Sequence, residues 1–277
     1  MLDARRVSGL ENPESRIEDR VYMTATSGRT VLSLGAHPDD AEFLCAGTLT
    51  LLHEKGWEIH IATMTPGDCG TVQYSRDQIS RIRKGEAAKS AALLDGSYHC
   101  LESGDIFILY DRPSLLKAIE LVRKVKPKIV FTTSPIDYMV DHEMASKLAK
   151  TACFACGVVN IETPGAEPFE PIPYLYYMDP VEHKDNFGAE IKASTIVDIS
   201  SVMDTKEKML CCHASQRHWL MTHHGMDEYV NMMKAADEEL GRQINSKYAE
   251  GFRQHLGHAY PQDDILKAEL GDLVHTV

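Results

Sequence analysis

The stretch TVLSLGAHPDDAEF, residues 30–43, joins an apolar run to a cluster of ionisable side chains. Its first part, TVLSLGAH, shows no polar alternation, which is typical of a parallel strand buried on both faces. His37, Asp39, Asp40 and Glu42 follow at the end of this run. Groups this close together repel or desolvate one another unless something offsets the cost. A bound metal cation would offset it.

Strand-like and helix-like segments alternate from this point on. The other predicted strands are WEIHIATMT (57–65), YHCLES (98–103), KIVFTTS (128–134), PYLYYMDP (173–180) and STIVDIS (194–200). The alternation predicts an α/β fold, with a Rossmann-like open, mostly parallel sheet and helices on both faces. We expect an N-terminal arm over 1–28 and a single domain over 29–277, which reads as helical from about Thr205.

A second polar cluster follows the fourth predicted strand, in the segment IDYMVDHEM (136–144). In open α/β sheets, ligands bind at the carboxyl ends of the strands, where the chain direction across the sheet reverses. If the strand order is 3-2-1-4-5, the first and fourth strands are neighbours across that point. The first cluster and the residues Asp137, Asp141 and His142 should then face each other across one crevice.

The spacing within the two clusters predicts a metal site. His37 and Asp40 lie three residues apart at a strand-to-helix turn, so both reach one point, and His142 adds a third ligand. Two His and one carboxylate with an open coordination position fit catalytic Zn²⁺, and Fe²⁺ or another divalent metal suits the same set. Asp39 diverges from Asp40 and is placed to act as general base on the metal-bound water. In the alternative interpretation, Asp40 only caps the helix and His37 only makes a hydrogen bond.

Composition narrows the classes of partner. The 277 residues contain 29 Lys and Arg against 41 Asp and Glu, a net charge of −12, which argues against nucleic acid as a partner. No segment reaches the ~18 apolar residues of a membrane span, and the polar N-terminus lacks the apolar core of a signal peptide. The seven Cys, an odd number scattered over the chain, indicate reduced thiols and a cytoplasmic location.

Five motifs in order resemble one known family. AHPDDAE is similar to the signature of the LmbE-like or PIG-L family of metal-dependent N-acetylglucosamine deacetylases. The segment DYMVDHEMA resembles the second metal motif of that family. Three further segments resemble its remaining motifs: RIRKGEAAKSAALL with Arg83 and Glu86, SGDIF with Asp105, and KEKMLCCHASQ with Lys206, His213 and Gln216.

The resemblance implies an enzyme that hydrolyses the N-acetyl group of an amino sugar or its conjugate, on a Rossmann-like sheet and commonly as a homo-oligomer. By motif match it makes His37, Asp40 and His142 the metal ligands and Asp39 the base. The expected partner is a small-molecule amino-sugar substrate, without nucleic acid or a membrane span. The candidate substrate-binding residues are Arg83, Asp105, Gln216 and His218.

One position departs from the family pattern. The second motif of the family reads Asp-Tyr-His-Pro-Asp-His, whereas this chain has Met139 in place of the first His. That His polarises the substrate carbonyl or protonates the leaving amine, and an oxyanion donor is typically worth ~3 kcal/mol of barrier. Either another group takes over the role, with His218, His223 and His224 of the late segment as candidates, or the chemistry differs, or the chain is a metal-binding relative with weak or no hydrolase activity.

Overall fold

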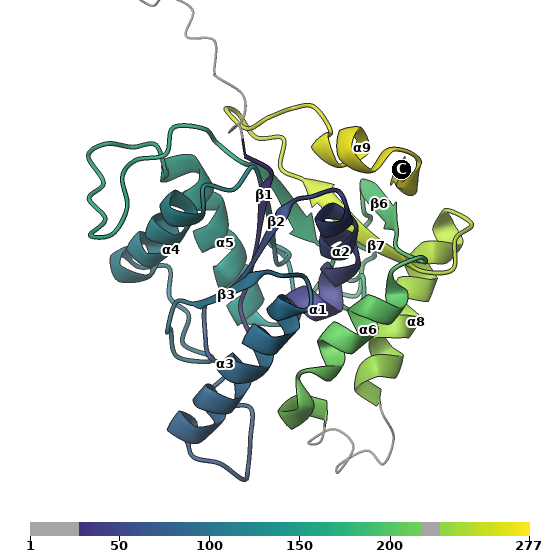
Figure 1. Ribbon diagram of the computed structural model, residues 1–277, viewed down its shortest axis with the longest axis horizontal. Helices are drawn as coiled ribbons and strands as arrows, with labels where there is room; N and C mark the ends of the chain where they lie inside the picture. Colours follow the sequence, from purple (N-terminus) through teal and green to yellow (C-terminus); the bar gives the residue numbers. More distant parts are fainter. Residues whose placement is uncertain (1–27, 218–227) are drawn as a thin grey trace, which may run out of the picture.

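One mixed sheet joins elements from Thr30 to Thr276, in the strand order β3-β2-β1-β4-β5-β7-β6-β8 (Figure 1). The computed structural model describes residues 28–217 and 228–277, so the expected arm over 1–28 lies outside the described residues apart from Gly28. The strands are β1 (Thr30–Gly35), β2 (Glu58–Thr63), β3 (Ser97–Cys100), β4 (Ile129–Thr132), β5 (Tyr174–Met178), β6 (Thr195–Asp198), β7 (Ala249–Gln254) and β8 (Val274–Thr276).

The first five strands are parallel and have the predicted order, with β1 between β2 and β4. The predicted fold class is therefore confirmed. The C-terminal region differs in part from the expectation of a helical segment, because β7 and β8 add antiparallel strands on the two sides of β6. β7 has a single large apolar residue, Phe252, and β8 has three residues. Neither shows the apolar run that marks the buried parallel strands.

Helices cover both faces of the sheet (Figure 1). Leu32 and Leu34 of β1 belong to a core shared with α4 and α5, while Val31 belongs to the core on the opposite face. This alternation places consecutive β1 side chains on opposite faces of the sheet. The first face carries α4 (Arg112–Val125) and α5 (Val140–Ala155). The second carries α1 (Asp40–Leu44), α2 (Ala46–Glu54), α3 (Arg76–Ala92), α6 (Met203–Cys211), α8 (Glu228–Gln243), α9 (Ile265–Leu270) and the 3₁₀ turn η1 (Gly271–Leu273).

Local signals explain where the helices near the candidate site begin and end. The Ser75 hydroxyl accepts a hydrogen bond from the Gln78 backbone N–H, and the Gln78 side chain accepts one from Ser75, which forms a capping box at the start of α3. The Asp111 side chain caps α4 through the Ser114 N–H at 2.9 Å. α4 ends at Val125, and the cap residue Lys126 is left-handed with φ 52°.

A buried ionic cluster ties the C-terminal elements to the sheet. The Lys206 Nζ of α6 lies 2.9 and 2.8 Å from the two carboxylate oxygens of Asp237 in α8, and 2.8 Å from the Glu250 Oε1 of β7. Glu250 also accepts the backbone N–H groups of Gly47 and Thr48, at the start of α2. Burial alone would lower the pKa of Lys206, but the two carboxylates raise it above its ordinary value. The cluster therefore joins four elements: α6, α8 and β7 meet at Lys206, and α2 is joined through Glu250.

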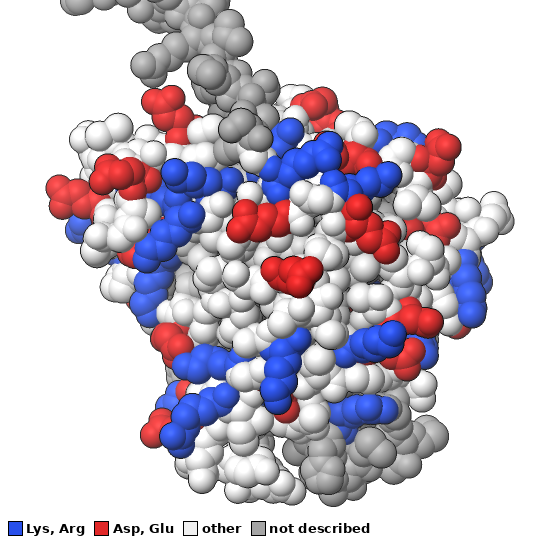
Figure 2. All heavy atoms as spheres, in the orientation of Figure 1, with Lys and Arg blue, Asp and Glu red and all other residues white. Residues whose placement is uncertain are grey.

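Acidic and basic side chains are interspersed on the face of the molecule shown in Figure 2. Over the described residues, every helix is too short or too polar to cross a lipid bilayer.

We predict that Lys206→Met destabilises the protein by about 3 kcal/mol or more, because removal of the cation leaves two buried carboxylates without their opposite charge. Urea denaturation followed by circular dichroism measures the change. Lys208→Met is the matched control, since Lys208 is exposed on the same helix, and it should change stability by less than ~0.5 kcal/mol. Equal stability of the two variants would contradict a structural role for the cluster.

Candidate metal centre

The turn between β1 and α1 fixes the first part of the site. The Asp40 Oδ2 accepts the backbone N–H groups of Ala36 at 2.7 Å and His37 at 3.1 Å. A Cβ atom at Gly35 would lie 2.8 Å from the Asp40 Cβ, so this close approach requires glycine. Asp39 takes a left-handed conformation with φ 112°, a conformation that non-glycine residues rarely adopt. The turn therefore holds one Asp40 oxygen against the backbone and leaves Oδ1 for other partners.

The structure brings His37, Asp40 and His142 together at neighbouring strand ends. The Asp40 Oδ1 lies 4.0 Å from the His37 Nδ1 and 3.4 Å from the His142 Nε2. One ligand atom from each residue lies within 4.8 Å of the others, and all three side chains are buried. His142 reaches this position because α5 begins directly after the loop that follows β4, next to β1.

Carboxylates support both imidazoles from behind. The His37 Nε2 lies 2.9 Å from the Asp105 Oδ1 and 3.0 Å from the Asp141 Oδ2. The His142 Nδ1 lies 3.0 Å from the Asp137 Oδ1. Such partners fix the ring orientation and leave the other nitrogen for a metal, as in many zinc sites. The donor set and its supporting carboxylates therefore fit a divalent metal ion, with Nδ1 of His37 and Nε2 of His142 as donors.

Charge distribution in the cluster favours a cation. Burial alone would lower the pKa of His37, but Asp105 and Asp141 raise it to about 9. Burial also acts to lower the pKa of His142, yet Asp40 and Asp137 raise it well above its ordinary value. The pKa of Asp40 falls below its usual range despite burial, because both imidazoles lie beside it. The carboxylates of this cluster therefore favour a positive charge at the two rings.

Asp39 lies beside the ligand cluster with two partners of its own. The Tyr229 hydroxyl donates a hydrogen bond to the Asp39 Oδ2, and the Arg83 Nη2 lies 3.3 Å from the same oxygen. The side chain of Asp39 is only 17% exposed. Burial raises the pKa of Asp39, while Arg83 and His213 act in the opposite direction. A carboxylate with a raised pKa suits proton transfer near neutral pH.

Arg83 and Gln216, predicted to bind substrate, hold the loop that follows β2. Arg83 donates to the carbonyl oxygens of Pro38 at 2.7 Å and Gly67 at 3.4 Å. The Gln216 Nε2 donates to the carbonyl oxygen of Gly70 at 3.1 Å. Gly67 is left-handed, and a Cβ atom there would lie 2.3 Å from the Arg83 Nη1. Both side chains therefore make contacts that shape the surroundings of Asp39.

The other residues of the late motif also contact the first helices. The His213 Nε2 lies 3.2 Å from the Glu42 Oε1 in α1. The Ser215 backbone N–H and hydroxyl donate to the two oxygens of Glu86 in α3, at 2.8 and 2.6 Å. The chain beyond residue 217 lies outside the described residues up to 227, and so do the predicted His218, His223 and His224.

Met139, which departs from the resembled motif, precedes α5 as its N-terminal cap residue. Its backbone N–H donates to the Asp137 Oδ1 at 3.1 Å. The neighbouring Tyr138 ring packs edge-on against His142, with 5.8 Å between the ring centroids, and is 66% exposed. Position 139 therefore lies in the loop that carries His142, although its side chain has no proton to donate.

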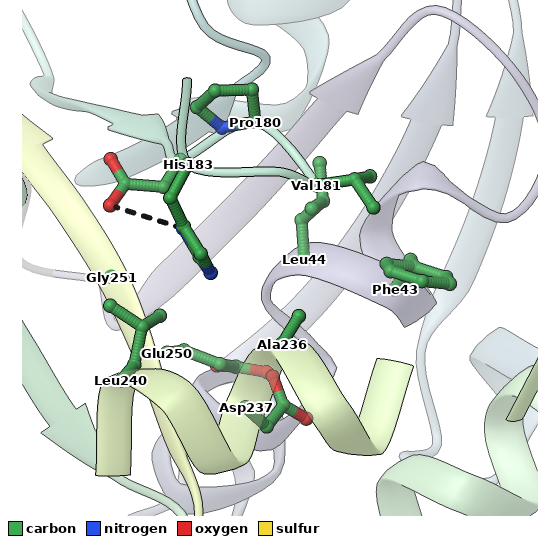
Figure 3. Close-up of a pocket in the computed structure, with 11 residues that line it drawn as sticks. Phe43, Leu44, Pro180, Val181, His183, Ala236, Asp237, Leu240, Glu250 and Gly251 are labelled. Atoms are coloured by element: carbon green, nitrogen blue, oxygen red, sulfur yellow. Dashed lines mark ion pairs between the residues drawn. The ribbon is translucent and has the colours of Figure 1, made fainter. Parts of the chain in front are cut away.

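A small pocket lies beside α1, one helical turn beyond Asp40, because Phe43 and Leu44 line it (Figure 3). Asp179, directly after β5, lies on its wall, with its Oδ2 3.9 Å from the His183 Nδ1. Within the described chain, neither Asp179 oxygen accepts a hydrogen bond. Burial raises the pKa of Asp179 to about 6, against the effect of Arg253. The pocket is separate from the three ligand atoms.

Comparison with known proteins agrees with the resemblance. Residues 32–153 match the family model PIG-L, described as GlcNAc-PI de-N-acetylase. This segment includes most of β1, the turn with His37 and Asp40, and most of α5 with His142. The chain carries a PIG-L family domain.

The relatives include enzymes of two kinds. The 4-oxalmesaconate hydratase of Pseudomonas putida is 26% identical over 204 residues, which cover 70% of this chain and 76% of that protein. The diacetylchitobiose deacetylase of Thermococcus kodakarensis is 25% identical over 249 residues, covering 86% and 88%. The structure of N,N'-diacetylchitobiose deacetylase from Pyrococcus horikoshii matches with a TM-score of 0.72 at 25% identity, covering 86% of this chain and 89% of that one. These relatives support an enzyme of the PIG-L family.

We predict that Zn²⁺ binding to the metal-free protein releases close to two protons at pH 7, one from each imidazole. Below a pKa of about 9, His37 carries a proton that the metal must displace. The apparent affinity should therefore weaken as the pH falls, and proton release should decline as the pH rises through about 9. Calorimetry in two buffers of different ionisation enthalpy measures the number of protons, and zinc binding without proton release at pH 7 would be the contrary result.

Proposed function

We propose that this protein is a metal-dependent hydrolase that removes the N-acetyl group from an N-acetylglucosamine-type amino sugar or its conjugate. The observation that supports this most strongly is the convergence of His37, Asp40 and His142 beside the carboxylate of Asp39. Zn²⁺ is the proposed cofactor, and Fe²⁺ or another divalent metal suits the same three ligands. The deacetylase relatives from Thermococcus and Pyrococcus give independent support.

A bound Zn²⁺ supplies Lewis-acid activation of water and of the amide carbonyl. Asp39 takes the proton of the attacking water and delivers it to the departing amine. Tyr229 fixes the orientation of the Asp39 carboxylate, and Arg83 stabilises its charged form. We further propose that Arg83, Asp105 and Gln216 form the substrate side through the loops that they hold, although Asp105 acts chiefly as a partner of His37.

A second candidate reaction is the addition of water to a carbon–carbon double bond. The match to the Pseudomonas hydratase favours it, and so does Met139, because a hydratase has no amine leaving group to protonate. Both reactions need a base that removes a proton from water. A third candidate, based on the same Met139, is a metal-binding relative with weak or no hydrolase activity.

One set of assays separates the three candidates. The metal-depleted protein is reloaded with Zn²⁺ or Fe²⁺ and incubated with N-acetylglucosamine, N,N'-diacetylchitobiose or an unsaturated dicarboxylate. A deacetylase releases primary amine and acetate in equal amounts. A hydratase releases no amine but removes the ultraviolet absorbance of the conjugated double bond. Metal binding without either product identifies the third candidate.

We predict that Asp39→Asn retains the metal and loses at least ~100-fold in kcat, because the amide keeps the shape of the side chain but cannot accept the proton. Metal content by mass spectrometry and turnover at saturating substrate are the two measurements. Asp95→Asn is the control, since its side chain is 92% exposed and tolerates the change. Wild-type turnover in Asp39→Asn would exclude Asp39 as the base.

A further inference from the structure

The loop after β3 carries an unusual surface segment, IFILY, residues 106–110. Ile108 is buried, but Ile106 is 72%, Phe107 68%, Leu109 60% and Tyr110 51% exposed. Consecutive large apolar residues on a surface loop serve a function or are a liability, because water solvates them poorly. The segment directly follows Asp105, the partner of His37.

Exposed apolar side chains surround the candidate metal centre on other loops as well. More than half of the large hydrophobic side chains that are exposed in the described chain lie on the loops after β2, β3, β4 and β5 or on the first residue of α5. All four of these strands end at the edge of the sheet where the metal ligands lie. We call six of them the apolar rim: Ile106, Phe107, Ile136, Tyr138, Val140 and Phe187.

Three contacts tie the rim to the residues of the candidate metal centre. The Ile106 N–H donates to the Asp141 Oδ2 at 2.7 Å, and that oxygen also contacts His37. Ile106 is left-handed with φ 70°, which is rare for a β-branched residue and tends to mark functional sites. Tyr138 packs on His142. Asn186, next to Phe187, donates to the Glu143 side chain at the start of α5. The rim is therefore built into the same framework as the site.

The position of the rim favours a substrate group over another protein as its occupant. A second copy seated on the loops of the rim would cover the ligand cluster that a substrate must reach. An apolar group attached to the substrate would instead contact the rim while the acetamide enters the site. Between Ile106 and Tyr110 the chain has no charged residue, so this part of the rim offers no ionic partner to a charged substituent.

We propose that the apolar rim binds an alkyl or aryl group carried by the substrate, so that this enzyme acts on an apolar conjugate of an N-acetylated amino sugar rather than on the free sugar. This inference rests on the proposed deacetylase function. Phe107 and Ile136 are the residues that we assign to this specificity, since they are exposed on two different loops and hold no metal ligand in place.

The test compares the octyl, phenyl and methyl glycosides of N-acetylglucosamine with the zinc-loaded protein. Amine release gives kcat/KM, and calorimetry gives binding independently of turnover. We expect kcat/KM for the octyl or phenyl glycoside to exceed kcat/KM for the methyl glycoside at least tenfold. Phe107→Ser or Ile136→Ser should reduce this ratio of kcat/KM values at least fivefold. The control is Phe154→Ser, because Phe154 is 54% exposed on α5 outside the rim, and it should keep the wild-type ratio.

The remaining outcomes are distinct. Equal rates and affinities for all three glycosides, or an equal change of the ratio in the control, would overturn the inference. If no glycoside is hydrolysed but the octyl or phenyl preference in binding persists and is lost in Phe107→Ser, the proposed function fails and the apolar specificity stands. Light scattering completes the test: an oligomer that Phe107→Ser converts to monomers would make the rim an interface between copies and overturn the assignment.

Discussion

The carboxylate of Asp40 is the point on which the site depends. One of its oxygens is held by two backbone N–H groups of the β1–α1 turn, and the other faces the imidazoles of His37 and His142. This arrangement requires β1 and β4 to be neighbours, since His142 enters from the helix after β4. The sheet order is thus a condition for the candidate metal centre. If β1 and β4 were not neighbours, the buried Asp40 carboxylate would lack the imidazole of His142 as a partner, and burying it would cost more free energy.

Two buried charge networks have different roles in this structure. Around His37 and His142 the carboxylates orient donors toward a shared point, which favours a cation from outside the chain. Around Lys206 the chain supplies its own cation, and Asp237 and Glu250 complete the pairing. The first network is therefore a candidate metal site, whereas the second joins α6, α8, β7 and α2 with charges that the chain supplies itself. Lys206, a residue of the late motif, therefore has a structural role in joining these elements.

Much of this arrangement was predictable, for identifiable reasons. Strands β1 to β5 have apolar runs that mark them as buried strands. The rule that ligands bind where the chain direction across the sheet reverses predicted that His37 and His142 lie close together. β7 and β8 were missed because their sequences lack such runs. Asp105 was expected on the substrate side, yet it contacts His37, since sequence order alone does not show which way a loop side chain turns. The contact of Tyr229 with Asp39 joins residues 190 positions apart, and nothing in the local pattern around Tyr229 indicates it.

The contact between Tyr229 and Asp39 limits how the chain can be divided into independent parts. The family match ends at residue 153, and it includes every proposed metal ligand and Asp39. Tyr229 comes from α8, and His213 and Ser215 follow α6, so the surroundings of Asp39, the proposed base, are assembled from sequence far beyond the match. The signature region is therefore not a self-sufficient catalytic module. If segments are exchanged between relatives, the part of the chain after residue 200 has to come from the same parent as the AHPDDAE turn. The reason is that Tyr229 of the later part holds the carboxylate of Asp39 in the turn.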